Sequence, residues 1–215
     1  MRTLVMPAVS FGNVGQLAVD VLIATLCHGA VPVAMRVDSA DHLEPLVTCD
    51  PFAPPARGAV STPIEVFAVS DALWVAQIRS VVVPGHARLL ADVLVRWAAA
   101  NGVERVVVLG GASALALDSE PMFDTRDTSR LVTLDGGHAS AFPLCAVDQL
   151  EFAGLTRHVL AVAADHRLSA QALVRLVFEG DNFGDGLTLA RDAVALLGLD
   201  AGPLREPGVW NTVRA

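Results

Sequence analysis

The feature that most constrains the fold lies in the first 26 residues, where an apolar run, a glycine turn and a helical pattern follow one another. Residues 3–9 (TLVMPAV) are continuously apolar, as expected of a strand that is buried on both faces. Residues 14–26 repeat apolar side chains at spacings of three and four, which predicts a helix with Asn13 as its N-cap. This order favours an α/β protein built on a parallel sheet.

The rest of the chain repeats this alternation of strand-like and helix-like segments. Apolar runs predict further strands, at 31–37, 65–69, 73–83 and 104–111. Ser70 and Asp71 separate the second and third of these runs and predict a hairpin turn between them. Three-and-four spacing predicts further helices, at 86–102, 168–178 (with Ser169 as its cap) and 185–197.

Two segments carry few periodic signals. Residues 44–63 hold five prolines, and residues 112–156 are rich in Asp, Ser and Gly, with apolar islands at 131–134 and 141–147. We expect one α/β domain over residues 1–199, with these two segments rich in loops, and a C-terminal tail over 200–215. The expected architecture is a three-layer α/β/α fold with a central, mostly parallel sheet.

The charge and the cysteine content exclude several classes of function. The net charge of −8 argues against nucleic-acid binding, because phosphates require a basic surface. All basic residues are arginines, so a phosphate-loop lysine and a Schiff-base lysine are excluded. Three isolated cysteines without paired spacing indicate a reducing compartment. The apolar stretch 17–35 is interrupted by polar residues, Gly and Pro, so no membrane span is expected.

The turn that holds Gly12 and Gly15 has two interpretations. A dinucleotide fingerprint needs a third glycine in G-x-G-x-x-G, and a phosphate loop needs a following lysine. Neither is complete, so we favour a tight strand-to-helix turn. The alternative is an anion-binding or phosphorylase-like α/β enzyme that uses the Ser10–Gly15 turn, because helix N-termini attract anions.

No other pattern indicates catalysis. The six histidines lack metal-ligand spacing, and a G-x-S-x-G nucleophile motif is absent. Asp181, Asn182 and Asp185 do not form a calcium loop, and they are better explained as capping groups for the helix that follows. Asp20 is expected to face solvent, and Trp97 to lie in the core. No catalytic, cofactor-binding or metal-binding residue is therefore expected.

Residue identity adds a family resemblance. The first block is LVMPAVSFGNVGQLAVD, and it is followed in order by LWVAQIRS, a helix ending in Trp97 with ERVVVLG after it, FEGDN, and PGVW. Together these blocks resemble the proteasome assembly chaperone 2 family. The residues that carry the family motifs are Pro7, Ser10, Gly12, Asn13, Gly15, Gln16, Gln77, Arg79, Glu179, Gly180, Asp181, Asn182, Pro207 and Trp210.

The resemblance implies a non-catalytic chaperone subunit. It would pair with proteasome assembly chaperone 1, and the heterodimer would bind alpha-type subunits of the 20S proteasome. Binding would promote assembly of the alpha ring and prevent off-pathway dimerisation of rings. No cofactor is implied, and the expected location is the cytoplasm, with the nucleus left open as a second compartment.

The C-terminus departs from the family pattern. Members can end in a hydrophobic residue, a tyrosine and one further residue, which dock between alpha subunits, whereas this chain has Arg214 at the tyrosine position. Trp210, Val213, Arg214 and Ala215 are the residues that we expect to contact a partner. We hypothesise that the other chaperone supplies the docking tail, so that deleting residues 211–215 leaves ring binding nearly unchanged.

Overall fold

The computed structural model describes residues 1–27, 41–44, 48–49, 60–114, 129–133, 142, 144–145, 154–208 and 210. Its strands are β1 (Thr3–Pro7), β2 (Thr48–Cys49), β3 (Val60–Ser61), β4 (Ile64–Ala68), β5 (Leu73–Ile78), β6 (Arg105–Ser113), β7 (Ser129–Thr133), β8 (Leu144–Cys145) and β9 (Ser169–Val177). Its helices are the 3-10 turn η1 (Phe11–Asn13), α1 (Val14–Leu26), α2 (Ala87–Ala100), α3 (Gly154–Asp165) and α4 (Phe183–Leu197).

The central sheet is mostly parallel, as the sequence predicts. Its strands follow the order β4-β5-β1-β6-β9-β7-β8 within the described residues. The pairs β5–β1, β1–β6, β6–β9 and β7–β8 are parallel, while β4–β5 and β7–β9 are antiparallel. The antiparallel β4–β5 pair confirms the predicted hairpin, and the Ser70 hydroxyl in its turn accepts hydrogen bonds from the backbone N–H groups of Ala72 and Leu73.

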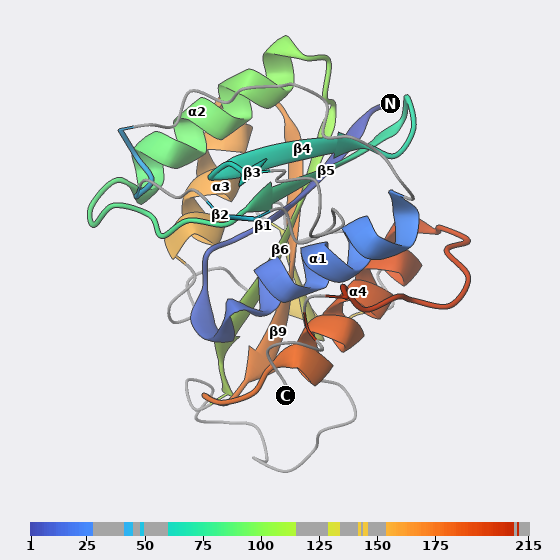
Figure 1. Ribbon diagram of the computed structural model, residues 1–215. Helices are drawn as coiled ribbons and strands as arrows, with labels where there is room; N and C mark the ends of the chain where they lie inside the picture. Colours follow the sequence, from blue (N-terminus) through green and yellow to red (C-terminus); the bar gives the residue numbers. More distant parts are fainter. Residues whose placement is uncertain are drawn as a thin grey trace.

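Helices cover both faces of the sheet and make the expected three layers (Figure 1). Helices α2 and α3 pack together on one face, and α1 and α4 on the other. The strand alternation divides the core accordingly: Leu4 and Met6 of β1 belong to the first cluster, whereas Val5 belongs to the second. No helix in the described part of the chain is long and apolar enough to cross a bilayer.

The predicted helix over 168–178 is wrong. Residues 169–177 form β9, which is parallel to β6 over nine residue pairs and antiparallel to β7 over five. Leu173 and Val177 face the core beneath α1 and α4, while Ala172 and Val174 face the core beneath α2 and α3. Because apolar residues lie on both faces of β9, they show no alternation and also satisfy a helical spacing.

The other predicted elements agree more closely with the structure. Helix α1 spans the predicted residues 14–26, and β7 overlaps the apolar island predicted at 131–134. Strand β5 ends at Ile78 rather than at residue 83. The strand predicted at 31–37 lies outside the described residues.

Candidate functional site

The family-motif residues gather at one edge of the sheet. Strands β1, β5, β6 and β9 run parallel, so their carboxyl ends meet at the same edge (Figure 1). Pro7 ends β1, Gln77 lies near the end of β5, and residues 179–182 follow β9. In open α/β sheets this edge is the usual place for a ligand site, which makes it the first place to look for function.

The opening turn is packed directly against β6. An added Cβ at Gly15 would lie 2.2 Å from the Leu109 carbonyl oxygen, and one at Gly111 would lie 2.3 Å from the Phe11 carbonyl oxygen. The Ser10 hydroxyl oxygen accepts a hydrogen bond from the Gly111 N–H at 2.9 Å. The glycines therefore permit close contact of backbone with backbone, which is the tight-turn interpretation of this motif.

The opening turn also contacts the late acidic turn. Gly12 is left-handed (φ 68°), and an added Cβ there would lie 2.6 Å from Nδ2 of Asn182. Asn182 is buried and donates a hydrogen bond to the Gly180 carbonyl at 3.2 Å. Asp181 accepts a hydrogen bond from the Phe183 N–H at 3.1 Å, as predicted for a group that caps α4. The two motifs thus form one packed unit.

Asn13 does not act through its side chain as predicted. It precedes α1, but its φ is 54° and its side chain makes no capping hydrogen bond. Side-chain N-caps have extended dihedral angles, whereas Asn13 occupies the left-handed region that Asn tolerates better than most residues. Its backbone N–H donates to the Ser10 carbonyl at 3.2 Å and closes the 3-10 turn.

A polar cluster joins α1 to the β4–β5 hairpin. The side-chain amide of Gln77 donates hydrogen bonds to the backbone carbonyl of Gln16 at 2.9 Å and to the Asp20 carboxylate at 2.6 Å. Arg79 lies 3.2 Å from Asp20 and 3.6 Å from Glu65, measured between nitrogen and oxygen. The side-chain amide of Gln16 donates to the Ile78 carbonyl at 3.1 Å. The motif residues Gln16, Gln77 and Arg79 are thereby brought together.

Asp20 is largely enclosed by this cluster, contrary to the expectation that it faces solvent. Its side chain is only 14% exposed, because the hairpin covers that face of α1. Burial raises the pKa of the Asp20 carboxyl, while the Arg79 guanidinium and the Gln77 hydrogen bond act in the opposite direction. Periodicity within one helix could not reveal this contact, since the covering residues come from strands more than forty positions away.

The C-terminal motif is part of the core. Trp210 is 3% exposed, and its ring centroid lies 4.7 Å from that of Phe183. The backbone N–H of Trp210 donates a hydrogen bond to the carbonyl of Pro207, and Pro207 is itself buried. Trp210 therefore presents little surface to a partner, contrary to its expected role as a contact residue. The other three residues expected to contact a partner, Val213, Arg214 and Ala215, lie outside the described residues.

The tryptophan of α2 lies at the margin of the core. Trp97 is half-buried rather than fully buried, and its ring centroid is 6.1 Å from that of Trp74. The Arg2 guanidinium carbon sits 4.1 Å from the centroid of the Trp74 ring, which gives a cation–π contact. These contacts fasten the N-terminus to the sheet.

The described residues do not assemble a metal centre. Within the described ranges, no three His, Cys, Asp or Glu side chains converge on a metal-sized site. Two of the described histidines, His42 and His86, lie side by side with their Nδ1 atoms 3.4 Å apart, and His86 Nδ1 also lies 2.8 Å from the Asp41 carbonyl oxygen. His28 and His138 lie outside the described residues.

The sequence revealed the motif residues but not the residues of the same chain that contact them. Glu65 and Asp20 complete the polar cluster, and Leu109 and Gly111 form the surface on which the opening turn rests. One signal was available: paired glycines inside a buried strand indicate close approach of another backbone segment. No comparable signal identified Glu65, because a carboxylate in a strand is ordinarily exposed.

Comparison with known proteins agrees with this architecture. Proteasome assembly chaperone 2 from Bos taurus is 29% identical over 209 residues, covering 87% of this chain and 78% of the relative. A Thermoplasma acidophilum protein of unknown function shares the fold, with a TM-score of 0.71 at 17% identity over 93% of this chain and 77% of that one. Pyrococcus furiosus PbaA, described as an archaeal homologue of proteasome-assembly chaperone, gives 0.64 at 14% identity, over 93% and 82%.

A family model also matches most of the chain. It describes the PAC2 family and covers residues 4–179, a range that begins in β1 and ends in the late acidic turn. The opening turn and the whole polar cluster fall inside this range, whereas Asn182, which contacts Gly12, lies just beyond it. The resemblance seen in the motifs is thereby confirmed, and the chain belongs to the PAC2 family.

Proposed function

We propose that this protein is a subunit of a chaperone that assembles the 20S proteasome. It pairs with proteasome assembly chaperone 1, and the heterodimer binds alpha-type subunits, promotes formation of the alpha ring and prevents off-pathway dimerisation of rings. The observation that carries the proposal is the match to proteasome assembly chaperone 2 over 87% of this chain. The expected location is the cytoplasm, and the nucleus if assembly also takes place there.

The geometry of the sheet edge favours a binding protein over an enzyme. The glycines of the opening turn are occupied by contacts with β6 and Asn182, and the polar cluster is closed by its own ion pair and amide hydrogen bonds. These residues shape and rigidify the fold. Rigid elements that present a surface are what a protein-binding module requires, because pre-organised surfaces lose little entropy on association.

The test is co-expression of this chain with proteasome assembly chaperone 1 and alpha-type subunits. The chain alone should be poorly soluble or aggregate, and co-expression should give a 1:1 heterodimer by light scattering. The heterodimer should then capture alpha-type subunits in size-exclusion chromatography. A well-behaved monomer that is thermally stabilised by phosphate or nucleotides, and that binds neither protein, would overturn the proposal in favour of an anion-binding enzyme.

The tail of the partner supplies the docking contact in this proposal. Residues 211–215 contain no tyrosine, and the guanidinium of Arg214 does not fill an apolar pocket as a phenol ring does. A heterodimer lacking residues 211–215 should therefore bind alpha-type subunits with nearly unchanged affinity. Truncation of the partner's tail should cause the large loss. A large loss on removing residues 211–215 would contradict this assignment.

A further inference from the structure

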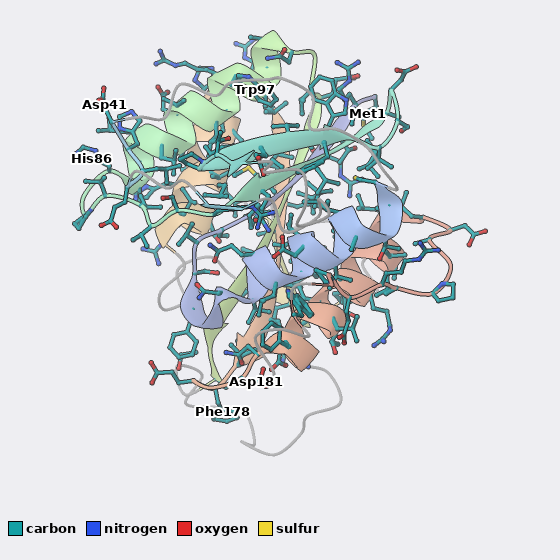
Figure 2. The ribbon with its side chains drawn as sticks, in the orientation of Figure 1. Met1, Asp41, His86, Trp97, Phe178 and Asp181 are labelled. Carbon is teal, nitrogen blue, oxygen red and sulfur yellow. The ribbon has the colours of Figure 1, made fainter. Side chains whose placement is uncertain are left out.

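The connection between β9 and α4 carries an exposed aromatic side chain. Phe178 is 51% exposed, and Glu179, Gly180 and Asp181 beside it are exposed as well. Figure 2 labels Phe178 and Asp181 beyond the arrowhead of β9, at the end of the molecule opposite Trp97. We call residues 178–181 the β9–α4 tip. Exposure alone is ordinary for a single apolar side chain, but aromatic side chains are enriched at protein interfaces, which makes Phe178 the residue to consider.

The tip is held in one conformation from both sides. On the β9 side, Arg175 donates a hydrogen bond to Asp185 of α4 at 2.7 Å and ties the strand to the helix. On the α4 side, Asp181 accepts the Phe183 N–H, and the buried Asn182 donates to the Gly180 carbonyl. The aromatic ring is thus displayed on a fixed scaffold, and pre-organised aromatic side chains dominate the energy of protein interfaces.

The charge around the ring is negative. From residue 175 to residue 185 the chain has three carboxylates and one guanidinium, and that guanidinium is already paired with Asp185. The side chains next to Phe178 on the tip, Glu179 and Asp181, are both acidic and exposed. A surface that accepts this tip needs an apolar pocket for the ring and basic side chains around it.

We propose that the β9–α4 tip docks on a basic surface with an apolar pocket on an alpha-type 20S subunit; this rests on the proposed function. The size of the tip favours the alpha-type subunit over the other chaperone. A stable protein–protein interface buries roughly 800 Å² on each partner. Four residues, of which one is aromatic and one is glycine, supply only a fraction of that area. A small acidic contact with one aromatic anchor fits a surface that must later be released.

The test compares variants of the heterodimer, in which this chain is paired with proteasome assembly chaperone 1. Phe178→Ala removes the anchor, and Glu179→Gln removes one exposed charge without touching a capping hydrogen bond. Leu89→Ala is the matched apolar control, since Leu89 is also 51% exposed but lies on α2. Asp200→Asn is the matched acidic control on another exposed carboxylate. Unchanged melting temperatures establish that each variant is folded.

Affinity for isolated alpha-type subunits is measured by calorimetry at low and high salt. Phe178→Ala should weaken binding at least about tenfold. Glu179→Gln should weaken it about threefold at low salt, with less salt dependence than the unaltered chain. The two controls should bind as the unaltered heterodimer does.

Two results overturn the inference and leave the proposed function intact. In one, both tip variants bind alpha-type subunits with unaltered affinity. In the other, Phe178→Ala dissociates the heterodimer, which assigns the tip to the other chaperone. If the unaltered heterodimer forms but captures no alpha-type subunit, the proposed function itself fails. The unaltered heterodimer alone reveals that outcome, so it can be distinguished from a failure of the inference about the tip.

Discussion

Replacement of Gly15 by alanine should destabilise the chain, although alanine is the better helix former. The new Cβ would lie 2.2 Å from the Leu109 carbonyl oxygen and 3.1 Å from that of Ala8. An ordinary contact begins at 3.4 Å, so the first turn of α1 and β6 must separate by about 1 Å. The same Leu109 carbonyl accepts the Ala8 N–H at 2.7 Å, so that separation also strains a buried hydrogen bond.

The magnitude follows from three contributions to the free energy of unfolding. Overpacking costs about 1–3 kcal/mol. Weakening the buried hydrogen bond costs about 1 kcal/mol more. The higher helix propensity of alanine stabilises the folded chain by about 1 kcal/mol. The net loss should therefore be about 2 kcal/mol, which for a chain of this size lowers the melting temperature by about 4–8 °C.

The matched control is Gly184→Ala, which also lies in the first turn of a helix. No atom lies within 4 Å of an added Cβ at Gly184, and its φ is not in the left-handed region. That substitution should stabilise the chain by about 0.5 kcal/mol. Urea unfolding followed by circular dichroism measures both changes. If Gly15→Ala leaves the free energy of unfolding within 0.5 kcal/mol of the unaltered value, packing is not the reason for this glycine.

Three further outcomes are expected. Arg79→Ala should lower the free energy of unfolding by about 3 kcal/mol in urea titrations, because it leaves buried carboxylates without their cation. The pKa of Asp20 is raised in the folded state, so the stability it contributes is present below about pH 4 and is lost as pH rises through the folded pKa. We therefore compare the free energy of unfolding of the unaltered chain with that of Asp20→Asn at several pH values. The difference, unaltered minus variant, should fall as pH rises from 4 towards neutrality. A difference that does not change with pH would contradict the raised pKa of Asp20. Burial raises the pKa of the Cys27 thiol to about 11, so a chain with Cys49→Ser and Cys145→Ser should react with Ellman's reagent at pH 8 only after unfolding.

Local patterns predicted the elements that carry a periodic or turn signal in their own sequence. Helix α1 and the β4–β5 hairpin carry periodic or turn signals of their own, and both were placed from those signals. Strand β9 has no such signal, because apolar residues lie on both of its faces and its neighbours are supplied by β6 and β7. Its identity as a strand is decided by pairing with distant segments, which no local window contains.

The same limit explains the polar residues. Asp20 has a helical position typical of a solvent-facing side chain, and only the arrival of Arg79 and Gln77 from β5 and its following loop makes its burial tolerable. The sequence predicts Asn182 as a capping group for α4, but its side chain makes no capping hydrogen bond; its amide instead donates to the Gly180 carbonyl and lies against Gly12. In both cases the contacts of the side chain depend on the tertiary fold, which no local window contains.

The carboxyl edge of the sheet shows what kind of function this fold can support. In many open α/β proteins a ligand binds at that edge. Here the motif residues of the opening and late turns pack against each other and against β6, through Gly12 against Asn182 and Gly15 against Leu109. Hydrogen bonds of Asp181 and Asn182 fix the backbone of the β9–α4 tip. In the function that we propose, this edge acts on another protein, because the side chain of Phe178 is accessible.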